Sequence, residues 1–316
     1  MSLAQRLQRA ISDLGPLGRI DEPLGPMTTY RVGGSAAIFV SPASVTDLRK
    51  IAEVIARYDL PVLVVGRGSN LLIADAGFAG VALSLAEFAD TIEMSGTRVS
   101  AGSAVALPVL ARRTAAAGLT GFEWAVGVPG SIGGAVRMNA GGHGSDIAAS
   151  LVQADVFDLH TQVLGWRPAE SLGLRFRGSN LMDHEIVLFA QLDLAEGDQQ
   201  QSEHEIAEIV RWRRDNQPGG QNAGSVFVNP IPGQLSAGEL IDRVGLRGFR
   251  VGGAFVSDKH ANFIQAGDGA TAADVKAVIE QVRERVAAET GYELRSEVRL
   301  VGFAEVGAAP EGSPHG

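Results

Sequence analysis

The 316-residue chain contains no cysteine. This absence excludes disulfide bonds, thiolate metal ligands, iron–sulfur clusters and a cysteine nucleophile. Long apolar runs are missing too, since no segment reaches the roughly 18 consecutive apolar residues that a membrane-spanning helix needs. The amphipathic N-terminus, MSLAQRLQRAISDL, has no uninterrupted apolar signal core. We therefore expect a soluble, cytoplasmic protein that has no metal site and does not insert into a membrane.

The chain has few positive charges: it contains 27 Lys and Arg residues and 36 Asp and Glu residues, which gives a net charge of −9. This balance argues against a surface that binds nucleic acid. An anionic small substrate remains possible, because a few arginines inside a cleft can reverse the local field.

Glycine, by contrast, is abundant, with 40 residues against a usual share of roughly 7%. The glycines have no collagen period and cluster at 66–80, 121–144 and 219–253. They therefore indicate special backbone geometry. With 45% hydrophobic residues, the chain is long enough to form two or three domains.

Hydrophobic periodicity predicts an α+β protein with at least two units that meet near 196–220. After a short N-terminal helix, we expect helices at 44–58, 106–117, 203–214, 237–244 and 271–290. We expect strands at 37–40, 62–65, 81–85, 152–157, 186–192, 253–256, 261–265 and 297–302.

The first glycine-rich loop, Gly66-Arg67-Gly68-Ser69-Asn70, directly follows a predicted strand. Glycines let consecutive backbone N–H groups approach an anion closely, as in a phosphate site. A Rossmann loop is excluded, because Leu71 occupies the third glycine position and no helix is expected next. A Walker loop is excluded because no Gly-Lys-Ser/Thr occurs. Taken alone, the loop is equally well explained as a tight turn.

The second loop is Gly127-Val128-Pro129-Gly130-Ser131-Ile132-Gly133-Gly134, and Asn139-Ala140-Gly141-Gly142 follows it. Two such loops, each beside a strand, are harder to explain as turns than one. We therefore favour a cradle of loop backbone, rather than a helix terminus, that holds the pyrophosphate of a dinucleotide.

Further motifs accompany the loops in a fixed order. They are TTYRVGG at 28–34, RFRGS at 175–179, QP at 217–218, AGSVFVNP at 223–230, AGELIDRVGLRG at 237–248, VSDKHANFI at 256–264 and LRSEVRLVG at 294–302. From about residue 22 to 303, this order resembles the UDP-N-acetylenolpyruvoylglucosamine reductase family of bacterial peptidoglycan synthesis. The shorter subgroup, which lacks an insertion with a substrate-capping tyrosine, is the better match.

The resemblance implies a two-lobed FAD-binding domain of the vanillyl-alcohol-oxidase (PCMH) type plus a C-terminal α/β substrate-binding domain. We expect the FAD-binding lobes at 1–85 and 86–215, the substrate-binding domain at 216–306 and a disordered tail at 307–316. The implied reaction is reduction of UDP-N-acetylglucosamine enolpyruvate to UDP-N-acetylmuramate, with NADPH as co-substrate and FAD as cofactor. Hydride passes from reduced flavin to the methylene carbon, and negative charge develops beside the carboxylate. Non-covalent FAD is expected, because cysteine is absent and His143 is the only histidine in a cofactor loop.

Three residues match the catalytic positions of the family. Arg177 would stabilise the enolate-like charge, and Ser225 would donate the proton. Glu297 would face the carboxylate of the intermediate, where it must be protonated or share a proton. The ordinary alternatives are a surface arginine paired with a carboxylate, a turn serine and a solvated carboxylate at a strand edge.

The resemblance also implies binding residues. The FAD-binding positions are Gly66, Arg67, Gly68, Ser69, Asn70, Gly127, Val128, Pro129, Gly130, Ser131, Gly133, Gly134, Asn139 and Gly141. The substrate-binding positions are Asn229, Lys259, His260 and Asn262.

Three positions depart from the pattern: Phe176 and His143 replace tyrosines, and Val228 replaces a common lysine. They affect details of binding rather than the three catalytic positions. Two other functions compete. One is a different flavin oxidoreductase, such as an oxidase of alcohols or hydroxy acids, and the other is a non-catalytic protein that binds flavin or a nucleotide sugar. The presence of all three catalytic residues favours the reductase.

Overall fold

The computed structural model describes residues 1–303, so the tail expected at 307–316 lies outside the described residues. The α-helices are α1 (Leu3–Leu14), α2 (Val45–Tyr58), α3 (Leu107–Ala116), α4 (Ile132–Met138), α5 (Gln199–Asn216), α6 (Ala237–Arg243) and α7 (Ala272–Thr290). Strands accompany them throughout, which confirms the α+β class. None of these helices combines the length and the apolar character that crossing a membrane requires.

The N-terminal part contains a four-stranded sheet in the order β1-β2-β5-β3. Its strands are β1 (Gly18–Pro23), β2 (Ser35–Val40), β3 (Val62–Val64) and β5 (Phe78–Leu83). Only β1 runs antiparallel to its neighbour. Helices α1 and α2 pack on one face, where Ile38 and Val40 meet Leu48 and Ile51. The side chain of Ser44 caps α2 by accepting a hydrogen bond from the Asp47 N–H, as the sequence pattern predicts.

The middle of the chain forms a five-stranded antiparallel sheet in the order β12-β11-β13-β7-β6. Its strands are β6 (Ile92–Ser95), β7 (Arg98–Gly102), β11 (Leu151–Asp158), β12 (Leu164–Pro168) and β13 (Glu185–Asp193). Apolar side chains of α3, α4 and α5 share one core with this sheet. Phe157 and Ile186 instead join the core under α2, so the two sheets are packed together. Two-stranded pairs add β8 (Leu119–Thr120) with β14 (Ala195–Glu196), and β9 (Gly141–Gly142) with β10 (Ser145–Asp146).

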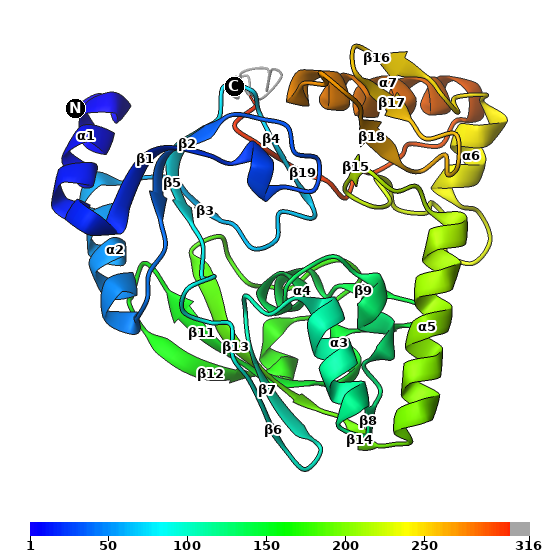
Figure 1. Ribbon diagram of the computed structural model, residues 1–316. Helices are drawn as coiled ribbons and strands as arrows, with labels where there is room; N and C mark the ends of the chain where they lie inside the picture. Colours follow the sequence, from blue (N-terminus) through cyan, green and yellow to red (C-terminus); the bar gives the residue numbers. More distant parts are fainter. Residues whose placement is uncertain (304–316) are drawn as a thin grey trace, which may run out of the picture.

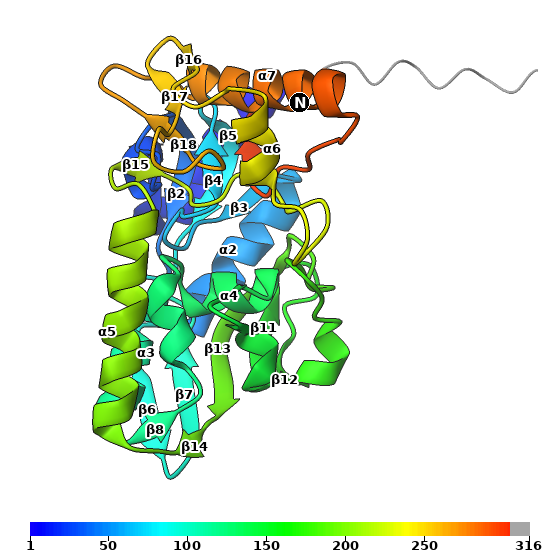
Figure 2. The ribbon, with the colours of Figure 1, turned by 90° about the vertical axis from the view of Figure 1, so that its right-hand side faces the viewer.

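The C-terminal part has an antiparallel sheet in the order β15-β18-β17-β16, packed against α7. Its strands are β15 (Gln221–Asn222), β16 (Arg250–Val251), β17 (Ala254–Val256) and β18 (Ile264–Ala266). Helix α5 runs from the middle part to this one along one side of the molecule (Figures 1 and 2). The chain then returns: β19 (Arg299–Val301) pairs in parallel with β4 (Leu71–Ile73), next to the N-terminal sheet.

Of the seven α-helices in residues 1–303, α4 is the one that the sequence analysis missed. Gly133 and Gly134 lie in its first turn, so the expectation that the cradle includes no helix terminus is wrong for the second loop. Glycine disfavours helix, but tertiary contacts hold this turn. The N–H groups of Ile132 and Gly133 donate to the carbonyls of Val105 and Ser103 at 3.0 and 2.9 Å.

Candidate active site

The two glycine-rich loops lie directly against each other. A Cβ added to Gly66 would lie 2.7 Å from Ser131 Oγ, and one added to Gly130 would lie 3.7 Å from Ser69 Oγ. Gly68 has a φ of +58°, and a Cβ there would lie 2.4 Å from the carbonyl oxygen of Met27. Glycine is therefore required at Gly68 by both contact and backbone conformation, and at Gly66 a Cβ would crowd Ser131, whereas Gly130 has room for one. The expectation that the loops form one site is consistent with this contact.

Two buried hydroxyl groups lie beside the loops without a hydrogen-bond partner among residues 1–303. Thr29 lies beside the first loop, because its N–H donates a hydrogen bond to the Gly68 carbonyl at 3.3 Å. Ser103 contacts the second loop, where a Cβ on Gly133 would lie 2.8 Å from the Ser103 Cβ. A buried hydroxyl is stabilised by a hydrogen bond. These groups therefore fit a polar ligand such as the phosphate and sugar groups of FAD.

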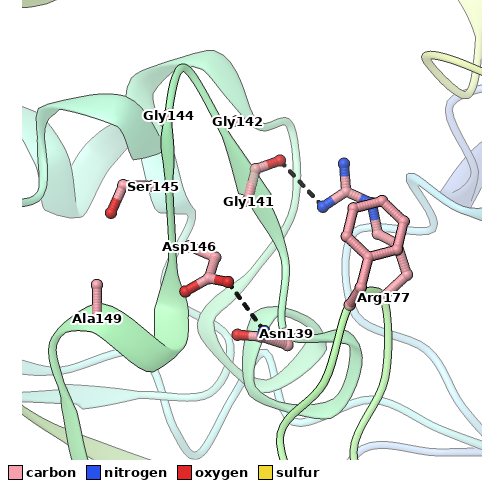
Figure 3. A pocket seen from close by; sticks show the side chains of 9 residues that line it. Asn139, Gly141, Gly142, Gly144, Ser145, Asp146, Ala149 and Arg177 are labelled. Carbon is pink, nitrogen blue, oxygen red and sulfur yellow. Dashed lines mark hydrogen bonds between the residues drawn. The ribbon is translucent and has the colours of Figure 1, made fainter. Parts of the chain in front are cut away.

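A cavity of about 410 Å³ lies near the second loop: Gly142 lines it, and a Cβ added to Gly142 would lie 3.8 Å from the Val128 side chain. Its walls include Gly141, Gly142 and Gly144, which contribute only backbone, together with Asp146 and Arg177 (Figure 3). Polar backbone with few side chains leaves room for a flat or branched ligand at close range. The lining thus fits a large cofactor better than a small ion.

Asn139 holds the walls of this cavity together. It is buried, caps the end of α4 with a φ of +40°, and accepts a hydrogen bond from the Ala148 N–H at 3.0 Å. Its amide donates to Asp146 at 3.0 Å, as Figure 3 shows, and to the Arg175 carbonyl at 3.3 Å. Its side chain therefore shapes the site mainly through protein contacts.

Arg177 lines the cavity, and its guanidinium group points toward the carbonyl of Gly141 (Figure 3). Its Nε lies 3.0 Å from Oε2 of Glu297, and its Nη1 donates to the Gly141 carbonyl at 3.2 Å. The backbone of Arg177 has a φ of +55°, a left-handed conformation that costs energy for a residue with a side chain. The structure thus brings together two predicted catalytic residues that are 120 positions apart.

Glu297 is also fixed through its backbone. Its N–H donates to the carbonyl of Val226 at 2.8 Å, and its own carbonyl accepts from the Asn70 amide at 2.8 Å. Phe227 and Ser296 form the adjacent antiparallel bridge. Ser225, the third predicted catalytic residue, is next to Val226 and therefore lies in the segment that is hydrogen-bonded to Glu297. Its exposed side chain forms no hydrogen bond within residues 1–303.

The predicted substrate-binding residues fall into two groups. Asn262 is buried, and its amide pairs with the backbone of Phe227 through bonds of 2.9 and 2.8 Å. The side-chain oxygen and nitrogen of Asn262 are therefore both hydrogen-bonded to the segment that contains Ser225. Asn229, Lys259 and His260 are less buried: Asn229 accepts from the Ala237 N–H, and Lys259 donates to the Arg214 carbonyl.

His260 lies between charged and apolar surroundings. Its Nδ1 accepts from the Asn262 N–H at 3.2 Å, and its ring meets that of Phe263 edge-on. Burial, with Arg247 nearby, lowers the pKa of His260 below its usual value. The ring is therefore held mainly neutral, as a hydrogen-bonding rather than an anion-pairing group.

Sequence reasoning missed Thr29, Ser103 and Asp146. Thr29 lies within a recognised motif, but nothing in the motif shows that its hydroxyl is buried beside Gly68. Ser103 lies in an ordinary turn, and only the contact with Gly133 singles it out. Asp146 would be suggested by its short spacing from Asn139: Asn139 ends α4 and Asp146 ends β10, seven positions later.

Comparison with known proteins gives two family matches on this chain. The family described as "FAD binding domain" matches residues 36–163. The family described as "UDP-N-acetylenolpyruvoylglucosamine reductase, C-terminal domain" matches residues 216–301. The first match covers both glycine-rich loops, and the second covers Ser225 and Glu297.

Relatives match over nearly their whole lengths. The UDP-N-acetylenolpyruvoylglucosamine reductase of Heliobacterium modesticaldum is 44% identical, covering 89% of this chain and 90% of that protein. The reductase of the same name from Bacillus subtilis is 37% identical, covering 89% and 93%. The crystal structure of UDP-N-acetylenolpyruvylglucosamine reductase from Thermus caldophilus has a TM-score of 0.78 at 34% identity, covering 90% of this chain and 99% of that one.

Proposed function

This chain belongs to the UDP-N-acetylenolpyruvoylglucosamine reductase family, and from that premise we propose how its own residues carry out the reaction. The enzyme is a flavin oxidoreductase that reduces the enolpyruvyl group of UDP-N-acetylglucosamine enolpyruvate with NADPH, in peptidoglycan precursor synthesis. The observation that carries the proposed site is the contact of Arg177 with Glu297, and of Glu297 with the segment after Ser225, beside the glycine-lined cavity.

FAD supplies hydride transfer when it is bound. Residues Gly66–Asn70 and Gly127–Gly134 would hold its pyrophosphate, with the hydroxyls of Thr29 and Ser103 as further partners. Asn139 and Gly141 would shape the neighbouring wall. Non-covalent binding is supported by the setting of His143, whose ring packs edge-on against Trp212 at 5.3 Å.

Arg177 would bind the carboxylate of the substrate and stabilise the negative charge that develops next to it. A fixed cation at such a position typically contributes about 10²–10³ in rate. In the structure its partner is Glu297, so an incoming carboxylate would compete with Glu297 for the guanidinium group. Two carboxylates beside one cation favour a shared proton. Glu297 would thus hold a proton at Oε2 while the substrate occupies Arg177.

Ser225 would donate the proton that completes the reduction. Its backbone is fixed, because Val226 is hydrogen-bonded on both sides, to Asn262 and to Glu297. Its hydroxyl is exposed and uncommitted within the described residues, which suits proton exchange with substrate and solvent. The side chain of Asn262 would hold the backbone of Phe227 in place. Asn229, Lys259 and His260 would contact the UDP-sugar.

We further propose that the enzyme works in the cytoplasm and supports cell shape and division. The proposal is supported by the substrates, because nucleotide sugars and NADPH are made and used inside cells. The domain boundaries expected at 85 and 215 remain a proposal as well. The family matches at 36–163 and 216–301 are compatible with them.

The reaction is tested with the purified protein. We expect a yellow flavin spectrum, with the flavin released by heat, and NADPH oxidation that depends on the enolpyruvyl UDP-sugar. Oxidation of NADPH at the same rate without that substrate would contradict the proposal and favour another flavin oxidoreductase. Flavin or UDP-sugar binding without turnover would favour a non-catalytic binding protein.

A further inference from the structure

Two histidines and an aspartate meet at one end of the five-stranded sheet, where β11 ends and β13 begins. Asp158 ends β11, His160 lies in the turn to β12, and His184 directly precedes β13. One ligand atom from each lies within 4.8 Å of the others. The spacing of these residues in the sequence gave no metal signature, because pairing between β11 and β13 brings them together.

The aspartate of this group is fixed in place. Asp158 Oδ1 accepts hydrogen bonds from the N–H groups of His160 and Thr161, at 2.7 and 3.2 Å. No hydrogen bond within residues 1–303 involves its second carboxylate oxygen. Nε2 of His184 lies 3.9 Å from Oδ1. Asp158 therefore offers an oriented oxygen next to an imidazole nitrogen.

The two imidazole rings lie face to face. Their centroids are 3.9 Å apart and their planes differ by 13°. His184 is largely buried, with 27% of its side chain exposed, whereas His160 is exposed. A tetrahedral ion with bonds of about 2.0–2.1 Å needs its ligand atoms roughly 3.4 Å apart. Binding an ion would therefore require the exposed His160 side chain to rotate out of the stack, and the Asp158 carboxylate to approach His184 Nε2, which lies 3.9 Å away.

The surroundings leave an approach to the group. A cavity of about 230 Å³ is lined by both histidines and by Leu60 and Pro61, which belong to the turn between α2 and β3. The neighbouring carboxylate of Asp183 is already paired with Arg137 and Arg299. The open positions around an ion would therefore be filled by solvent.

We propose that Asp158, His160 and His184 form a binding site for a divalent transition-metal ion, with Zn²⁺ as the representative. Two imidazole nitrogens and one carboxylate oxygen suit such ions, whereas Mg²⁺ prefers a set of oxygen ligands. The bound ion ties the turn after β11 to the start of β13, beside the turn that precedes β3. The site is separate from the residues assigned to the reaction.

The test is titration of the FAD-loaded protein with ZnCl₂ by isothermal calorimetry, with MgCl₂ as the comparison ion. We expect one Zn²⁺ per chain and no comparable binding of Mg²⁺. His160→Ala and His184→Ala should each weaken Zn²⁺ binding at least about tenfold. The matched control is His204→Ala, because His204 is an exposed histidine that pairs with Glu208 at 3.3 Å on α5 and has no third ligand.

His160→Ala decides the matter even if His184→Ala fails to fold, because His160 is exposed and its removal leaves the sheet intact. Zn²⁺ at 100 times its dissociation constant should also raise the melting temperature of the wild-type protein by several degrees, and that of His160→Ala by less. Absence of saturable Zn²⁺ binding would overturn the proposal. So would unchanged binding in both variants, or an equal loss in His204→Ala.

Discussion

At the scale of single residues, Glu297 is bound through three atoms that lead to three different parts of the chain. Its N–H reaches Val226, its carbonyl is held by Asn70, and its carboxylate pairs with Arg177. The position of Glu297 therefore depends on the first glycine-rich loop and on the segment that contains Ser225. A substitution in either segment should shift the backbone of Glu297 even though its side chain is unchanged.

Asn70→Ala tests this dependence. Loss of the 2.8 Å bond frees the Glu297 carbonyl, and a hydrogen bond is worth about 0.5–1.5 kcal/mol. At saturating FAD, kcat should fall by about 2- to 10-fold, with a small change in flavin affinity. Both are measured by NADPH oxidation and by quenching of flavin fluorescence. Weaker flavin binding with unchanged kcat at saturation would mean that Asn70 acts only as a cofactor contact.

Ser225→Ala separates the two halves of the reaction. The flavin should still be reduced by NADPH, because Ser225 is assigned only to protonation of the substrate. Turnover with the enolpyruvyl UDP-sugar should fall by roughly 10²–10⁴. Stopped-flow absorbance follows flavin reduction, and product formation follows turnover. Ser225→Cys, which keeps a proton donor, should recover part of the turnover, and loss of both half-reactions in Ser225→Ala would show that Ser225 is structural.

Much of the site was named from motifs, but its contacts were not. The sequence order identified Arg177, Ser225 and Glu297, and the structure shows that Arg177 and Glu297 are in contact. Their catalytic roles remain predictions. No sequence pattern reveals that the Asn262 side-chain amide is hydrogen-bonded to the Phe227 backbone, because these bonds join positions 35 apart that come together only after folding.

At the scale of elements, the first turn of α7 is capped from a distant part of the chain. Thr271 accepts from the Asp274 N–H, as the capping box predicts. The N–H groups of Ala272 and Ala273 both donate to the carboxylate of Asp75, each at 2.9 Å. Asp75 follows β4, so this carboxylate attaches the C-terminal helix to the N-terminal part while meeting the positive end of the helix dipole.

Asp75→Ala should therefore destabilise the protein by about 0.5–2 kcal/mol, the usual cost of losing a helix cap. Chemical denaturation followed by circular dichroism measures this loss. The matched control is Asp268→Ala, which removes a nearby exposed carboxylate that forms no hydrogen bond or ion pair within the described residues. Equal effects of the two substitutions would show that Asp75 contributes only its charge.

Elements with strong local signals were predicted closely, and those without were not. Helices α2, α3 and α7 match their expected ranges within a residue or two. In α2 and α7 a side-chain cap agrees with the apolar spacing, and in α3 Pro108 lies in the first turn. Helix α5 begins at Gln199 rather than at 203, because Asp198 caps a first turn that contains no apolar residue. Helix α4 was missed because its glycine-containing first turn is held by contacts from another part of the chain. The N–H groups of Ile132 and Gly133 donate to the carbonyls of Val105 and Ser103.

At the scale of the whole molecule, the N-terminal and C-terminal parts are joined in two ways. Tyr30 and Leu72, from the N-terminal part, lie in the core under α7. Strand β19, which follows the C-terminal part, pairs with β4 of the N-terminal part. The C-terminal part is thus held to the FAD-binding part by a shared core as well as by a strand. Composition and motif order predicted separate units, but only the folded chain shows this exchange.

Asp183 adds an electrostatic connection between the same parts. Its carboxylate oxygens lie 2.6 Å from Arg137 on α4 and 2.9 Å from Arg299 on β19, and 60% of its side chain is exposed. Asp183→Ala would leave two like charges close together without their shared partner. Because exposed pairs contribute about 0.2–1 kcal/mol each, we expect a loss of about 1 kcal/mol at low salt.

The size of this loss should depend on ionic strength. The Debye length falls from about 30 Å at 0.01 M to about 3 Å at 1 M salt, so the difference between Asp183→Ala and wild type should shrink markedly over that range. Asp215→Ala is the control, since Asp215 pairs only with its neighbour Arg214 on α5 and joins no separate elements. Denaturant titrations at both salt concentrations measure the difference. If Asp183→Ala loses the same stability at both, the three residues connect the parts through packing and hydrogen bonds rather than through charge.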